Sequence, residues 1–153
     1  MNFGLCRILM SVINGKIDKG AVFPGDIQDT FWDFLTIFGY DSYLQQNVFH
    51  PAEVAHATLG RTPTTALAYQ FPATGGWDSG DLASVSGGAG WHDSVDELLD
   101  IKGTFRRKTV IMPHANAQTL LDSYFSIDEI ADTAAGRLYN KCGGSGFLDS
   151  GIS

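Results

Sequence analysis

The apolar positions at the start of the chain follow the period of an α-helix. Within residues 3–14, branched aliphatic side chains recur at helical spacing: Leu5, Ile8, Leu9, Val12 and Ile13. Asn14-Gly15 then supplies a C-terminal stop. We therefore predict a helix over 3–14 whose apolar face lies in the core.

Two further helical stretches are expected before residue 52. The first runs from about Thr30 to Phe38 and ends at Gly39. Its apolar face is interpreted as core and consists of Phe31, Phe34, Leu35 and Phe38. The second begins at a cap, Asp41, and runs through Asn47. His50-Pro51 ends it, because the residue before a proline avoids helical geometry.

The middle of the chain predicts a strand and then a long loop. Ala66 to Phe71 reads as a short strand closed by Pro72. Residues 73–90 are rich in glycine, serine and aspartate. They lack the spacing of a phosphate-binding loop, so we interpret them as a surface loop. A loop of this length inside a compact domain is often functional.

A capping box marks the next helix. Ser94 is followed three residues later by Glu97, just before an apolar run, which predicts a helix to about Thr104. The basic cluster Arg106-Arg107-Lys108 is interpreted as a positive last turn, which suits the helix macrodipole. A connector and a short helix over 114–122 follow. Its buried positions are expected to be Ala117, Leu120 and Leu121.

Alternating residues near the C-terminus predict antiparallel β structure. Residues 124–130 and 137–141 alternate around a turn at 134–136, and a further strand begins at Phe147. The fold class predicted is α+β. We expect one domain over 1–153, mostly helical over 1–60, with the glycine-rich loop, a helix and the terminal strands in 61–153.

Composition and charge exclude several functions. The 153 residues are 44% hydrophobic, which suffices for a core. A net charge of −7 disfavours nucleic-acid binding, because an acidic surface repels phosphate backbones. The two cysteines, Cys6 and Cys142, form neither a disulfide framework nor a metal motif. We predict no cofactor, no transmembrane segment and no signal peptide; the compartment stays open.

The candidate chemistry lies at Lys141-Cys142-Gly143-Gly144. The pattern predicts a strand that ends here in a lysine, a small residue and two glycines. A substrate approaches a strand closely where side chains are absent, and the ammonium meets a carboxylate there. This is the physical logic of the Lys-[Ser/Thr]-Gly motif in serine acyl-transfer enzymes.

Three passages, in order, resemble the C-terminal part of the serine β-lactamase-like family, which includes penicillin-binding proteins, DD-peptidases and esterases. Residues 3–15 are similar to the helix that follows the family's Tyr-x-Asn motif. Residues 86–99 are similar to its Gly-Gly-x-x-Ser-x-x-Asp-Leu segment. Residues 136–146 lie where the family places the strand with Lys-Thr-Gly or His-x-Gly. The resemblance implies a partial β-lactamase/transpeptidase-like fold, with helices packed on an incomplete antiparallel sheet.

The resemblance also implies roles for the four candidate residues. Lys141 would support a substrate carboxylate electrostatically, and Gly143 would let the substrate lie against the strand. Cys142 replaces the usual threonine or serine, and a thiol is a poor hydrogen-bond donor. The backbone N–H of Gly144 would be the oxyanion donor. The implied partner is a small-molecule or peptide acyl substrate.

Two family motifs are absent from the sequence. No serine starts a Ser-x-x-Lys motif, and no tyrosine starts a Tyr-x-Asn motif. The chain is therefore predicted to be a fragment of a serine hydrolase that is inactive alone. A sheet without its neighbouring strands exposes edges, so we also expect marginal stability or self-association.

Two other hypotheses stay open. The first is a non-catalytic binding module that uses the glycine-rich loop with Trp77 and Trp91. The second is an independent enzyme in which Cys142 pairs with His92 or His114. For the second, an inert cysteine and ordinary histidines are the preferred interpretation, because one sequence permits many such pairings.

Overall fold

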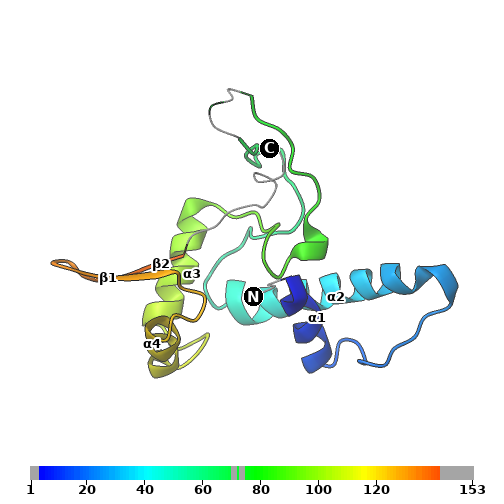
Figure 1. Ribbon diagram of the computed structural model, residues 1–153, viewed down its shortest axis with the longest axis horizontal. Coiled ribbons are helices and arrows are strands. Elements are labelled where there is room, and N and C mark those ends of the chain that lie inside the picture. The colour runs from blue at the N-terminus through cyan, green and yellow to red at the C-terminus, as the bar shows by residue number, and fades with distance from the viewer. Residues whose placement is uncertain (1–3, 70–71, 73–74, 142–153) are drawn as a thin grey trace, which may run out of the picture.

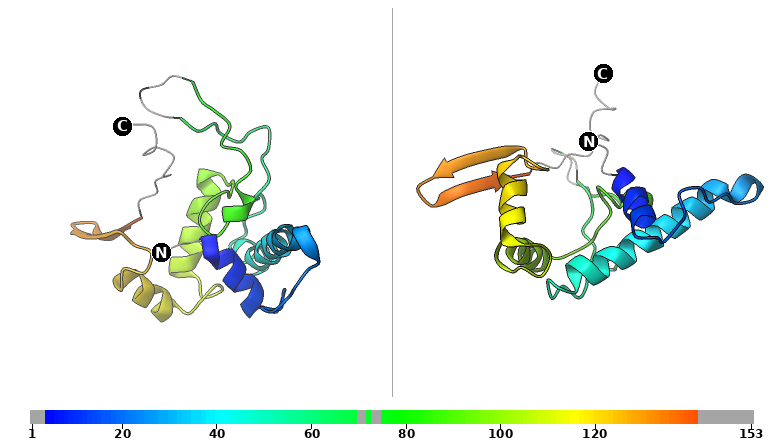
Figure 2. Two further views of the ribbon diagram at one scale, coloured as in Figure 1. Left: turned by 45° about the vertical axis from the view of Figure 1, so that its right-hand side comes forward. Right: turned by 90° about the horizontal axis from the view of Figure 1, so that it is seen from below.

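The computed structural model describes residues 4–69, 72 and 75–141. These residues form an α+β fold, as predicted, with four α-helices and one two-stranded antiparallel sheet (Figure 1). The helices and strands are α1 (Gly4–Ile13), α2 (Gln28–Leu44), α3 (Val95–Arg107), α4 (His114–Asp122), β1 (Glu129–Thr133) and β2 (Gly136–Asn140). Helices α1 and α2 pack together at one end, and the β hairpin projects at the other (Figures 1 and 2).

Helix α2 is longer than predicted, because Gly39 does not end it. A Cβ atom at Gly39 would lie 2.9 Å from Ser11 Oγ and 3.0 Å from Lys16 Cβ. The glycine is needed for the close approach of α1 to α2. The prediction of a helix end at Gly39 was therefore wrong: the residue serves packing, at a helix-propensity cost of about 1 kcal/mol.

The contact between α1 and α2 is polar. Arg7, Ser11 and Thr36 are buried there. The Ser11 hydroxyl donates to the Thr36 carbonyl at 2.9 Å, and Arg7 Nη2 donates to Asp33 Oδ1 at 2.8 Å. These bonds fix the rotation of α1 about its axis.

The predicted apolar core face of α1 is consequently wrong, although the helix itself is confirmed. Leu5, Leu9 and Ile13 are exposed, since the face with Arg7 and Ser11 is turned to α2. The same correction applies to α2. Its three phenylalanines on the expected core face are all exposed: Phe31, Phe34 and Phe38.

The chain passes from α2 directly into a π-helical turn, η2 (Gln45–Phe49). The predicted break before Asp41 is therefore absent, whereas the predicted end at His50-Pro51 is confirmed. Gln45 fixes this turn, since its side-chain Nε2 donates to the Ala57 carbonyl at 2.9 Å.

The hydrophobic core lies just beyond η2. Its buried members are Phe49, Ala52, Val54 and Ala57, with Leu44, Val48, Trp91 and Ile101 packed against them. The ring centroids of Phe49 and Trp91 are 4.8 Å apart. This cluster joins the end of α2 to the glycine-rich segment and to α3.

The strand predicted over 66–71 is wrong for its described residues. Ala68 and Trp77 form an isolated bridge, with backbone N–H···O distances of 3.0 and 2.9 Å, rather than part of a ladder. The loop prediction for the following segment holds in its described part, with a single 3₁₀ turn, η3 (Ala83–Val85). Gly90 is required there, because its φ is +89° and a Cβ atom would lie 2.8 Å from the Leu82 carbonyl oxygen.

The capping box of α3 is confirmed. Glu97 N donates to Ser94 Oγ at 3.2 Å, and Ser94 N donates to Glu97 Oε2 at 2.9 Å. Such a cap contributes about 1 kcal/mol. The helix continues past Thr104, and Arg106 and Arg107 occupy its last turn as predicted. Helix α4 also matches its predicted range. Of its three expected buried positions Ala117 is buried, whereas Leu120 and Leu121 are only partly buried.

The hairpin is antiparallel, as predicted. Thr133 pairs with Gly136 around the two-residue turn Ala134-Ala135. Strand β1 begins later than expected, because Tyr124 and Ser126 have φ values of 55° and 59°, which turn the chain. The strand predicted at Phe147 lies outside the described residues.

The expected packing of the helices on the sheet is wrong for α1 and α2, which lie away from the hairpin (Figure 2). The hairpin instead meets α4 through Tyr139, which accepts a hydrogen bond from Gln118. Within the described residues, none of the helices combines the length and hydropathy needed to cross a bilayer.

Candidate functional site

Lys141 follows strand β2 directly, at the position predicted for the substrate lysine. Its Nζ lies 2.8 Å from Asp128 Oδ2 and 3.1 Å from Oδ1. The Asp128 N–H also donates to the Asn140 carbonyl at 2.9 Å, so backbone and side-chain contacts together close the open end of the hairpin. Both side chains are about half exposed, so the ion pair contributes less than about 1 kcal/mol.

The other predicted substrate-binding residues, Cys142, Gly143 and Gly144, lie outside the described residues. Of the four predicted substrate-binding residues, Lys141 is therefore the one whose position the structure describes. If a substrate carboxylate bound at the end of β2, the Lys141 ammonium would contact both that carboxylate and Asp128. Such sharing is chemically reasonable, because a lysine ammonium has three donors.

A hydrogen-bond network that the sequence did not predict joins α4 to β2. Gln118 Nε2 donates to Tyr139 Oη at 2.7 Å and to Asp122 Oδ2 at 2.9 Å. The Tyr139 hydroxyl donates to Asp122 Oδ1 at 2.7 Å. Gln118 and Asp122 are four residues apart on one face of α4, a spacing at which helical side chains interact and which is visible in the sequence. Their contact with Tyr139 on β2, however, depends on tertiary packing.

Hydrogen bonds from Gln118, Tyr139 and Arg137 hold the pKa of the Asp122 carboxyl below its usual range. Arg137 also makes a two-point contact with its register partner Asp132, with Nε–Oδ1 and Nη2–Oδ2 distances of 2.8 and 3.2 Å. This contact lowers the pKa of Asp132 and raises that of Arg137. The hairpin is thus fixed to α4 by the hydrogen bonds that Tyr139 and Arg137 donate to the exposed Asp122 carboxylate.

Acidification is expected to loosen the hairpin from α4. The folded-state pKa of Asp122 is depressed, so its contribution to stability is present above the unfolded pKa of about 3.9 and is lost as pH falls through the folded value. Tyr139→Phe removes one of the bonds to the carboxylate. Carboxyl ¹³C NMR titration should therefore show a higher Asp122 pKa in this variant than in the wild type. Identical titration curves would contradict the network.

Two of the described histidines, His56 and His92, make contacts that hold the fold. His56 Nδ1 lies 3.3 Å from Glu97 Oε1, and the His56 N–H donates to the same oxygen at 3.0 Å. Hydrogen bonding, first from the Ser94 backbone, lowers the pKa of Glu97, as expected for a helix cap. His92 exchanges backbone hydrogen bonds with Thr58. The proposed partner thiol, Cys142, is outside the described range, and within that range no cluster of metal-ligating side chains occurs.

Two serines of the described segments are fully buried, and neither is activated. The Ser11 hydroxyl donates to a backbone carbonyl, and the Ser86 hydroxyl has no hydrogen-bond partner among the described residues. A serine without an adjacent base is a weak nucleophile.

The candidate site therefore consists of a lysine at the end of a hairpin strand, beside a carboxylate-rich contact with α4. Its charged groups at the end of β2 are the Lys141 ammonium and the Asp128 carboxylate, and neither of the two buried serines has an adjacent base among the described residues. Comparisons of the chain with protein-family models, with curated proteins and with solved structures find no match.

Proposed function

We propose that this chain is a region of a serine acyl-transfer enzyme with a β-lactamase/transpeptidase-like fold, in which Lys141 contacts the substrate. The observation that carries the proposal is the placement of Lys141 one residue beyond β2, the return strand of an antiparallel hairpin. A glycine-rich segment that leads into the capped helix α3 adds support. Both features occur in the order that the resemblance implies.

The proposed chemistry is the one that the resemblance implies. The lysine ammonium would stabilise a substrate carboxylate, and glycines, which lack side chains, would let the acyl group approach the backbone closely. The backbone N–H of Gly144 donates to the developing oxyanion. The nucleophile and its base come from outside the 153 residues, so the chain alone is inactive. Substrates are a β-lactam, a peptide or an ester.

The upstream reading frame provides the first test. The proposal requires an in-frame Tyr-x-Asn before Met1 and a Ser-x-x-Lys further upstream. The longer protein should then hydrolyse a chromogenic β-lactam or a nitrophenyl ester. Lys141→Ala is expected to lower kcat/KM about 10²-fold, as for loss of one transition-state contact. Lys141→Arg should retain most activity, because the charge stays.

A matched control is Lys108→Ala, which removes the same charge from a lysine whose Nζ lies 3.5 Å from Glu53. It should leave kcat/KM within about twofold, because an exposed ion pair contributes little. Two results would contradict the proposal. One is an upstream frame without Tyr-x-Asn. The other is turnover by the 153-residue chain that a single alanine substitution within it abolishes.

A second candidate function is a non-catalytic binding module. The exposed apolar faces of α1 and α2 favour association with another polypeptide surface. Of the two tryptophans predicted for this role, Trp77 is exposed and Trp91 is not. Trp91 packs on Phe49, and its indole N–H donates to the Ser86 carbonyl at 2.9 Å. Self-association through the edges of the hairpin belongs to the same proposal.

A further inference from the structure

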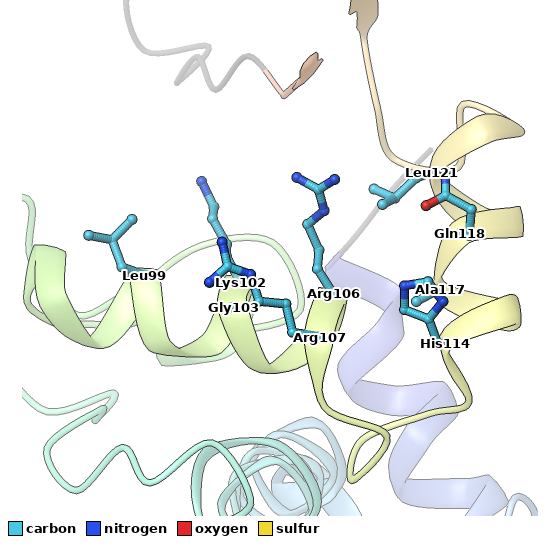
Figure 3. A pocket seen from close by; sticks show the side chains of 9 residues that line it. All are labelled: Leu99, Lys102, Gly103, Arg106, Arg107, His114, Ala117, Gln118 and Leu121. Carbon is cyan, nitrogen blue, oxygen red and sulfur yellow. The ribbon is translucent and has the colours of Figure 1, made fainter. Parts of the chain in front are cut away.

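A cleft between α3 and α4 collects positive charge on an acidic chain (Figure 3). Its volume is about 590 Å³, within the range of small-molecule sites. The basic side chains that line it are Lys102, Arg106 and Arg107, with His114 opposite. These are three of the chain's 10 lysines and arginines, and no acidic residue lines the cleft.

The three cations of the cleft have no carboxylate partner among the described residues. Arg106 Cζ lies 5.5 Å from the centroid of the Tyr139 ring, so the contact that Arg106 makes here is with an aromatic ring and not with a carboxylate. Of the seven other basic residues, five form ion pairs with a carboxylate, as Arg137 does with Asp132 and Lys141 with Asp128, and Lys16 and Lys19 form none among the described residues. The cleft is therefore a local positive field on a chain of net charge −7.

The helix macrodipole accounts for part of this cluster only. Arg106 and Arg107 lie in the last turn of α3, where positive charge is favourable. Lys102 lies further back, and the dipole effect falls off within the last turn. His114 belongs to a different helix. Figure 3 shows Lys102 and Arg106 projecting from the same side of α3, with Gln118 and Leu121 of α4 beside them.

We propose that the α3–α4 cleft binds a small organic phosphate, with the phosphate group between Arg106 and Lys102. A phosphate monoester carries close to two negative charges at neutral pH, which matches several cations better than one carboxylate does. Arginine adds a rigid fork of donors for its oxygens. Leu99, Ala117 and Leu121 supply an apolar wall for the organic part. The site is separate from the proposed acyl-transfer role of Lys141.

Amide NMR titrations with phenyl phosphate and with inorganic phosphate test the proposal on the full chain. Phenyl phosphate should give saturable shifts confined to α3 and α4. Inorganic phosphate should bind at least about fivefold more weakly, since it lacks an apolar part. Arg106→Gln should weaken phenyl phosphate binding about tenfold or more. Lys102→Gln provides a second, independent variant with the same expectation.

Lys108→Gln is the matched control, because it removes one positive charge just outside the cleft. It should change the dissociation constant by less than about twofold, as an exposed charge is screened by salt. The proposal is overturned by any of three results. These are absence of saturable shifts in α3 and α4, equal weakening by Lys108→Gln and Arg106→Gln, or equal affinity for the two phosphates.

Discussion

Phe49→Ala is expected to destabilise the protein by about 3–5 kcal/mol, the range for truncation of a buried phenylalanine. Phe49 is 7% exposed and is the largest side chain among the buried core residues around it. Its ring contacts Trp91, so the substitution opens a cavity where η2, the glycine-rich segment and α3 meet. Because domains of this size are stable by about 5–15 kcal/mol, the loss is a large fraction of the total.

Urea unfolding followed by tryptophan fluorescence and far-UV circular dichroism measures this effect. Phe34→Ala is the matched control, because it removes the same atoms from a side chain that is 66% exposed. We expect that variant to lie within about 0.5 kcal/mol of the wild type. An equal loss of unfolding free energy in the two variants would show that Phe49 does not lie in the hydrophobic core.

Local patterns predicted the elements whose causes are local. The capping box at Ser94 and Glu97 set the start of α3, since both hydrogen bonds join residues three positions apart. His50-Pro51 set the end of η2 for a steric reason that also needs no tertiary contact. The hairpin turn before Gly136 follows the same rule, because the paired strands are adjacent in sequence.

Helix faces were predicted poorly, because packing partners decide them. Apolar spacing in α1 placed Leu5 and Leu9 inside, whereas the structure buries Arg7 and Ser11. The reason lies on α2. Asp33 and Thr36 bind the polar face of α1, and Gly39 leaves room for its close approach. Gly39 was predicted to end its helix because the sequence does not show that α1 packs against this position.

In the candidate site, too, the locally determined part was predicted and the part that depends on packing was not. Lys141 was placed correctly at a strand end, because strand alternation is visible in the sequence. The network of Gln118, Asp122 and Tyr139 and the cleft between α3 and α4 were not predicted. Both depend on how separate elements pack against each other, so no spacing within one element contains them.

Asp33→Ala is expected to destabilise the protein by about 3 kcal/mol, because it leaves a buried charge without its counter-ion. The Arg7 side chain is 5% exposed, and Asp33 Oδ1 is 2.8 Å from its Nη2. Asp33 itself is half exposed, so its removal exposes little apolar surface. The cost therefore comes from the guanidinium that remains between α1 and α2, and urea unfolding measures it.

Combining Asp33→Ala with Arg7→Met tests that origin. Methionine fills much of the space of arginine without its charge, so the double variant should be more stable than Asp33→Ala alone by about 1–2 kcal/mol. Asp100→Ala serves as the control, because it removes an exposed aspartate within α3 and should be neutral or slightly stabilising by helix propensity. If the double variant is instead less stable than Asp33→Ala, Arg7 contributes through packing and its hydrogen bond to Thr36 rather than through charge balance with Asp33.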